Sequence, residues 1–251
     1  MNASTLNLCF ALAALLIIAI AGWFPFKQRV TTEKPVDFPM GETLATGVFL
    51  GAALLHMLPE SNALFMQSKL HYPFAYVICG ATFLFFLWFE HLGKELYHHH
   101  DRSHPAFAIV AWLMLSIHSF VSGTALGLSH DYATRIMLFL AIITHKWAES
   151  FAIAIQLNKS TLNMKKGIAL FVVFALMTPF GIWTGWEFGQ DVNTHSLIDP
   201  ILMSVSAGTF LYLGTLHGLE RCVMVERCCN LNDFSFVIVG FLLMAAVAAF
   251  I

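Results

Sequence analysis

Long stretches without charged residues constrain this chain more than any other feature of its sequence. The hydrocarbon core of a bilayer needs about 20 consecutive apolar residues of helix. Seven stretches of suitable length lack Asp, Glu, Lys and Arg, and an eighth carries Lys146 and Glu149 near its middle. In chain order the eight are Met1 to Phe26, Thr43 to Pro59, Leu70 to Phe89, Ser103 to His130, Ile136 to Leu157, Gly167 to Trp186, Pro200 to Leu219 and Phe234 to Ile251. The sequence therefore predicts an all-α, polytopic membrane protein with eight transmembrane helices.

The overall composition excludes the main alternative classes of protein. Hydrophobic residues make up 58% of the chain and charged residues only 11%, whereas about 25% of the residues of an ordinary soluble domain are charged. The formal net charge of −2 provides no basic field, so we expect no nucleic-acid partner. The first stretch has no basic residue before Leu6 and is longer than the apolar core of a signal peptide. We therefore expect a transmembrane helix there rather than a cleaved signal.

Basic residues in the links predict the orientation of the helices, because Lys and Arg near helix ends favour the cytoplasm. The links after the first, third, fifth and seventh stretches contain Lys27, Arg29, Lys34, Lys94, Arg102, Lys159, Lys165, Lys166, Arg221 and Arg227. The links on the opposite side contain only Lys69 and Arg135. Both termini are therefore expected outside. Since every link is short, we also expect a single transmembrane domain over residues 1–251.

Two pairs of stretches share a pattern although the members of each pair cross the bilayer in opposite directions. The second and seventh stretches match at identical spacing, with Gly47, Phe49, Leu50 and His56 recurring as Gly208, Phe210, Leu211 and His217. The run that starts at His118 matches the run that starts at His145 in the same way. Inverted repeats are typical of secondary transporters, whose substrate site lies near the middle of the membrane. Chance similarity among helices rich in Leu, Phe and Ala is the alternative.

Three pairs of polar residues within these stretches are spaced four apart, which places each pair on one face of its helix. They are His118 with Ser122, His145 with Glu149, and His56 with Glu60. Ionisable groups inside a membrane are costly and usually mark an ion or proton pathway, although a lone histidine more simply forms a hydrogen bond between helices. Imidazole with carboxylate suits zinc, iron, manganese or cadmium, whereas Ca²⁺ and Mg²⁺ prefer oxygen ligands. The pattern predicts transport of a divalent transition metal, with zinc as the first candidate.

The sequence around the two central histidines resembles a known family. The runs HSFVSGTALG from His118 and HKWAESFAIA from His145 are similar to the paired fourth and fifth helices of the ZIP (Zrt/Irt-like) metal transporters. The resemblance extends to GVFLGAALLHMLPE from Gly47 and to FALMTPFG from Phe174. It implies eight helices with both termini outside, a metal site between helices four and five, uptake towards the cytoplasm and a homodimer. It also implies that helices one, four, five and six slide as a unit against the others.

The chain departs from the family pattern at two positions. The family commonly has Glu where this chain has Ser122, and an acidic residue in helix seven where this chain has His217. Lys146 resembles the branch of the family with a His-Lys pair. Because a fixed ammonium beside His145 repels a second cation, we predict one metal ion at a time. The predicted metal ligands are His118, His145, Glu149 and His56.

Other polar residues give further hypotheses about the transport pathway, which would also include Ser122, Lys146 and His217. Glu60 would receive metal at the entrance or lie in the solvated interface. A cytoplasmic loop at about residues 92–104 contains His98, His99, His100 and His104. Such a histidine tract can receive metal ions as they leave, and an ordinary solvated loop is the alternative.

The transport hypothesis places the protein in the plasma membrane or the bacterial inner membrane, with the bilayer and the metal ion as partners. The metal would be the transported substrate, so no prosthetic group and no enzymatic activity are expected. An intramembrane zinc hydrolase is the alternative, in which His118, His145 and a further histidine hold Zn²⁺ while Glu149 activates water. A b-type haem protein with histidine axial ligands is the third hypothesis.

Overall fold

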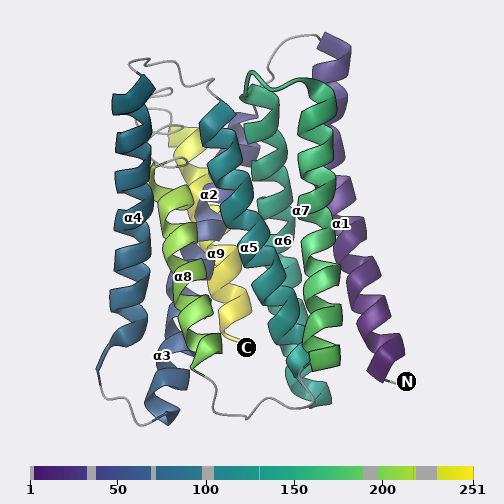
Figure 1. Ribbon diagram of the computed structural model, residues 1–251, viewed down its shortest axis with the longest axis vertical. Helices are drawn as coiled ribbons and strands as arrows, with labels where there is room; N and C mark the ends of the chain where they lie inside the picture. Colours follow the sequence, from purple (N-terminus) through teal and green to yellow (C-terminus); the bar gives the residue numbers. More distant parts are fainter. Residues whose placement is uncertain are drawn as a thin grey trace. The chain divides into compact units, whose positions relative to one another are not determined.

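The computed structural model describes residues 3–32, 38–68, 72–97, 105–129, 131–188, 197–216, 218 and 231–250. Across this part of the chain the secondary structure is helical and contains no strand (Figure 1), which confirms the predicted all-α class. The elements are α1 (Ala3–Thr32), α2 (Pro39–Gly51), the π-helix η1 (Ala52–Met57), α3 (Leu58–Gln67), α4 (Phe74–Tyr97), α5 (Pro105–Leu128), α6 (Tyr132–Lys159), α7 (Met164–Phe188), α8 (Ile198–Tyr212) and α9 (Leu231–Ala248).

Seven of the predicted spans appear as helices that are long and apolar enough to cross a bilayer. One of these, Pro39–Gln67, consists of α2, η1 and α3 in succession. The remaining predicted span corresponds to α8, which has 15 residues and is followed by a π-helical turn over 213–216. His217 and residues 219–230 lie outside the described part of the chain. The count of eight spans and the location of the termini therefore stay predictions.

The described helices form two compact units. The first unit contains α1, α5, α6 and α7, with α5 packed against α6 and α7, and α1 packed against α6 and α7. The second unit contains α2, η1, α3, α4, α8 and α9, with α2 packed against α9 and α8 packed against α3 and α4. The first unit is thus made of the same helices that the ZIP resemblance groups together.

Glycines bring α5 and α7 into close contact in the first unit. A Cβ atom at Gly181 of α7 would clash with the carbonyl oxygen of Phe120, and one at Gly123 of α5 would clash with the carbonyl oxygen of Thr178. Gly127 and Gly185 repeat this reciprocal contact one turn further along. Small residues four apart allow such close approach between membrane helices. Any side chain at these positions would push apart the two backbones that hold α5 in place.

The other central helix of the first unit, α6, is fixed at its start and near its middle. Its N-cap residue, Asp131, accepts hydrogen bonds of 2.8 Å from the backbone N–H and the hydroxyl of Thr134. Those two hydrogen bonds, the backbone one first, lower the pKa of the Asp131 carboxyl below its ordinary value. Further along, the Ser150 hydroxyl donates to the carbonyl oxygen of Ile18 in α1 at 2.7 Å. The hydroxyl bond thus fixes α6 to α1, while the glycine contacts fix α5 to α7.

The second unit contains a departure from α-helical geometry that the sequence analysis missed. The chain is π-helical over Ala52–Met57 and again over 213–216 and at Gly218. Pro59 gives a reason for the first π-helix, because proline cannot donate to the carbonyl four residues earlier and its ring clashes with that carbonyl. The two π-helical segments occupy matching positions in the similarity between the second and seventh stretches. The internal similarity is therefore accompanied by the same local helix geometry.

The glycine contact between α5 and α7 predicts the effect of adding a single methyl group. We expect Gly181→Ala to lower the free energy of unfolding by about 1–3 kcal/mol, because the new Cβ atom meets backbone rather than a flexible side chain. Gly80→Ala in α4 is the matched control, since a Cβ atom there has nothing within 4 Å. Thermal unfolding of the detergent-solubilised protein should show a lower Tm for Gly181→Ala and an unchanged or higher Tm for Gly80→Ala. Equal shifts would contradict the close packing.

Candidate metal site

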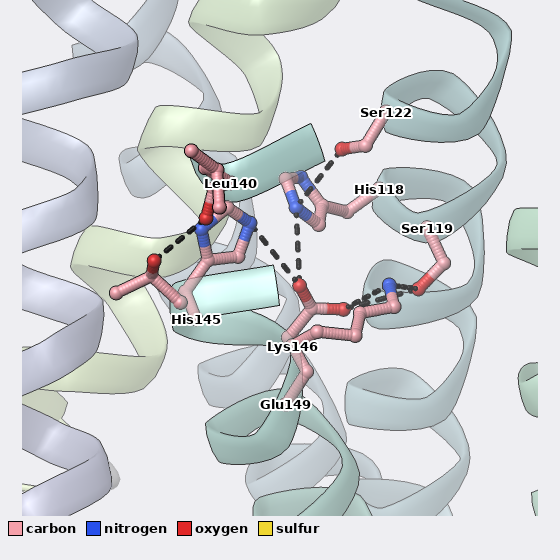
Figure 2. A network of polar contacts seen from close by, with 8 residues as sticks. His118, Ser119, Ser122, Leu140, His145, Lys146 and Glu149 are labelled. Atoms are coloured by element: carbon pink, nitrogen blue, oxygen red, sulfur yellow. Dashed lines mark hydrogen bonds and ion pairs between the residues drawn. The ribbon is translucent and has the colours of Figure 1, made fainter. Parts of the chain in front are cut away.

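Two histidines and one glutamate meet between α5 and α6 in the first unit (Figure 2). His118 projects from α5, while His145 and Glu149 lie one turn apart on α6. Glu149 Oε1 is 3.4 Å from His118 Nε2 and 3.5 Å from His145 Nε2. The potential ligand atoms of the three residues all lie within 4.8 Å of one another. The structure therefore brings together the three central residues of the predicted set.

The separations among these atoms suit a bound metal ion better than direct hydrogen bonds. Glu149 Oε1 is buried and accepts no hydrogen bond, although two ring nitrogens face it. Ligands at about 2.0–2.1 Å from a tetrahedral zinc ion lie about 3.3–3.4 Å from one another. The two oxygen-to-nitrogen distances of 3.4 and 3.5 Å are close to this value. His118, His145 and Glu149 could thus hold one metal ion.

The second oxygen of Glu149 has different partners. Oε2 accepts hydrogen bonds from Lys146 Nζ at 2.8 Å and from the Ser119 hydroxyl at 3.1 Å. Lys146 Nζ also donates to Ser119 Oγ at 2.7 Å, and it lies 5.5 Å from the centre of the Phe174 ring. Lys146, Glu149 and Ser119 each have 0% exposure. The carboxylate therefore divides its two oxygens between an ammonium group and the two imidazoles.

Ser122 reaches the cluster from the same helix as His118. Its hydroxyl lies 3.2 Å from His118 Nε2, the nitrogen that also faces Glu149. A hydroxyl can donate to a neutral ring nitrogen or accept from a protonated one. Ser122 therefore stands beside the possible ligand atoms, as its spacing from His118 predicts, but it brings no charge.

The remaining predicted residues fall outside this cluster. In the second unit, His56 Nδ1 lies 3.4 Å from Glu60 Oε2, which confirms that this pair shares one face of its helix. His56 belongs to η1 and Glu60 to α3, whereas the cluster belongs to the first unit. The role of His56 as a fourth ligand therefore stays a prediction. His98, His99, His100 and His217 lie outside the described residues.

Sequence reasoning missed Ser119, which connects Lys146 to Glu149. A residue adjacent to His118 points about 100° away from it around the helix, so spacing alone did not place Ser119 in the site. The sequence nevertheless contained evidence for Ser119, because this residue aligns with Lys146 when the run from His118 is matched to the run from His145. Polar residues at both of these matched positions indicate that they face one another.

Fold and cluster together define an integral membrane protein with potential metal ligands buried among its helices. The sequence matches the family model described as ZIP Zinc transporter over residues 4–108 and 98–248. Mouse zinc transporter ZIP2 is 27% identical over 90% of this chain and 89% of its own length. Human zinc transporter ZIP2 is 26% identical over 82% and 83%. Bovine zinc transporter ZIP1 is 33% identical over a shorter region, 45% of this chain and 36% of its own length.

The chain belongs to the ZIP zinc transporter family. It is therefore an integral membrane protein that transports metal ions, as the sequence analysis predicted. Members of this family are transporters and not enzymes, so the hydrolase alternative is not favoured. The divalent metal ion is the transported substrate and not a prosthetic group.

The buried pair of Lys146 and Glu149 generates a prediction about stability. Removing one member of a buried ion pair leaves an uncompensated charge, which costs about 3–5 kcal/mol. We therefore expect Lys146→Met and Glu149→Gln each to lower the free energy of unfolding by about this amount, and the double variant to lose much less than their sum. Unfolding in detergent with a metal chelator present measures all four proteins of this cycle. Additive losses would show that the two charges do not depend on each other.

Proposed function

We propose that this chain carries Zn²⁺ across the membrane towards the cytoplasm, with His118, His145 and Glu149 as the ligands that bind it. The position of Glu149 Oε1 supports this most directly. This oxygen is buried, has no hydrogen bond and lies between two imidazole nitrogens. The ZIP2 proteins of mouse and human, which match most of this chain, are both zinc transporters. Iron, manganese and cadmium are the alternative substrates.

The donor atoms support zinc over the common hard cations. Two imidazole nitrogens with one carboxylate oxygen match the ligands that zinc takes in proteins, whereas Ca²⁺ and Mg²⁺ are bound by oxygen ligands. Fe²⁺ also accepts two histidines and one carboxylate, which makes it the nearest competitor. Three protein ligands leave one position open, and we assign it to His56 or to water. An open position also suits a carrier, because it allows the ion to exchange.

The second oxygen of Glu149 supports a site for one ion at a time. In a two-metal site a carboxylate usually bridges the ions through its two oxygens. Here Lys146 Nζ lies 2.8 Å from Oε2, so an ammonium group occupies the place where a second ion would bind. A second cation at this place would meet direct electrostatic repulsion. Ser122 adds no carboxylate that could offset the repulsion.

The location of all three proposed ligands in one unit supports a carrier mechanism. His118, His145 and Glu149 all belong to the first unit, so a bound ion can move with that unit while the second unit stays in place. We propose this sliding within a single transporter domain over residues 1–251, with eight spans, both termini outside and two chains per assembly. Glu60 and His217 would lie on the pathway of the ion, and His98, His99 and His100 would receive it on the cytoplasmic side.

Metal uptake by reconstituted protein tests the proposed function. Purified protein in liposomes should accumulate radiolabelled Zn²⁺, and both His118→Ala and Glu149→Ala should reduce the initial rate at least about tenfold, since each removes one of three ligands. His91→Ala is the matched control, because this exposed histidine bonds to Leu87 of its own helix α4. The control should retain the wild-type rate. Wild-type liposomes that accumulate no Zn²⁺, Fe²⁺, Mn²⁺ or Cd²⁺ would refute the proposal.

A further inference from the structure

The charges around Glu149 balance without any metal ion. Lys146 Nζ and Glu149 Oε2 lie 2.8 Å apart, and both side chains have 0% exposure. The Ser119 hydroxyl accepts from the ammonium and donates to the same carboxylate oxygen. One positive and one negative charge therefore stand in direct contact, and the empty site has no net charge as long as the two histidines are neutral.

We propose that Lys146 is the built-in counter-ion of the empty site, and that it allows the unloaded carrier to return across the membrane without a cation in place of the metal. This inference rests on the proposed function, because it concerns the half of the transport cycle that follows metal release. Lys146 is a positioning residue that acts through Glu149, and it determines whether the carrier catalyses net uptake or only exchange.

Lys146 lowers the cost of moving the empty site through an occluded state. A carboxylate without a counter-ion is strongly destabilised where water is excluded. A carrier whose empty site held only Glu149 would therefore return slowly unless another cation took the place of the metal. Such a carrier exchanges one metal ion for another but catalyses little net uptake. With Lys146 in place, the empty site crosses as a neutral ion pair.

The position of Lys146 on α6 preserves this pair throughout the cycle. Lys146 and Glu149 are three residues apart on the same helix, so they lie on neighbouring positions of one face. Ser119, on α5, belongs to the same compact unit. A movement of the first unit against the second leaves these three residues in contact with one another. The counter-ion therefore accompanies the carboxylate in both orientations of the site.

Metal binding does not require the ion pair to break. The ammonium is bonded to Oε2, while Oε1 faces His118 Nε2 and His145 Nε2. A metal ion can bind Oε1 and the two imidazoles while Lys146 keeps its contact with Oε2. The ion pair therefore stays intact in the loaded site as well as in the empty one.

The test compares net uptake with exchange in the same preparation of liposomes. Radiolabelled Zn²⁺ is added outside vesicles that contain either a metal chelator or unlabelled Zn²⁺, and the ratio of the two initial rates is measured. Net uptake requires the empty site to return, whereas exchange does not. We expect Lys146→Met to lower the ratio of net uptake to exchange at least about tenfold, the factor that corresponds to about 1.4 kcal/mol in a barrier. Lys146→Arg, which keeps the charge, should retain the wild-type ratio.

A second variant keeps the proposal testable if Lys146→Met is too unstable to purify. The double substitution of Lys146→Met and Glu149→Gln removes both charges, so its empty site is again neutral. Both rates should fall because a ligand is altered, but their ratio should return to that of the wild type. A wild-type ratio for Lys146→Met, or a low ratio for the double variant, would overturn the counter-ion role while leaving zinc transport intact. Wild-type protein that moves no metal in either mode would instead refute the proposed function and this inference with it.

Discussion

The candidate site depends on how the two oxygens of the Glu149 carboxylate are shared between different partners. Glu149 Oε2 is bonded to Lys146 and Ser119, and Oε1 faces two imidazole nitrogens. A buried carboxylate without such partners would be strongly destabilised in a membrane. The ammonium stabilises Glu149 within the bilayer, and by occupying one oxygen it also directs the other oxygen towards the histidines. The contact that stabilises the buried carboxylate therefore also leaves Oε1 facing the histidines as a proposed metal ligand.

Helix packing supplies the precision that this arrangement needs. The proposed metal ligands come from α5 and α6, and a change of about 1 Å in their separation would spoil the geometry of a bound ion. The reciprocal contacts of Gly123 and Gly181 place α5 directly on α7, and the hydrogen bond from Ser150 to Ile18 holds α6 to α1. Rigid contacts inside the first unit are also what a carrier requires if its site is to move without losing its shape.

Much of this architecture follows from the sequence, because the features concerned repeat with the period of a helix. The long apolar stretches predicted seven helices of spanning length, with helix ends displaced by up to eight residues. The spacing of four placed Glu149 beside His145. The contact between His118 and Glu149 joins two helices, so its prediction relied on the family resemblance. Ser119 was missed because its position depends on how α5 faces α6. The π-helix at His56 was missed because it arises from a shift in backbone hydrogen bonds near Pro59, which hydrophobic periodicity does not record.

Anomalous X-ray scattering from crystals of the wild-type protein grown with Zn²⁺ tests the proposed metal site most directly. We expect one strong peak per chain in this region, about 2.0–2.2 Å from His118 Nε2, His145 Nε2 and Glu149 Oε1, with Lys146 still bonded to Oε2. Two peaks that share Glu149 would contradict the role of Lys146 in excluding a second ion. An absence of any peak among these residues at saturating Zn²⁺ would contradict the metal site itself.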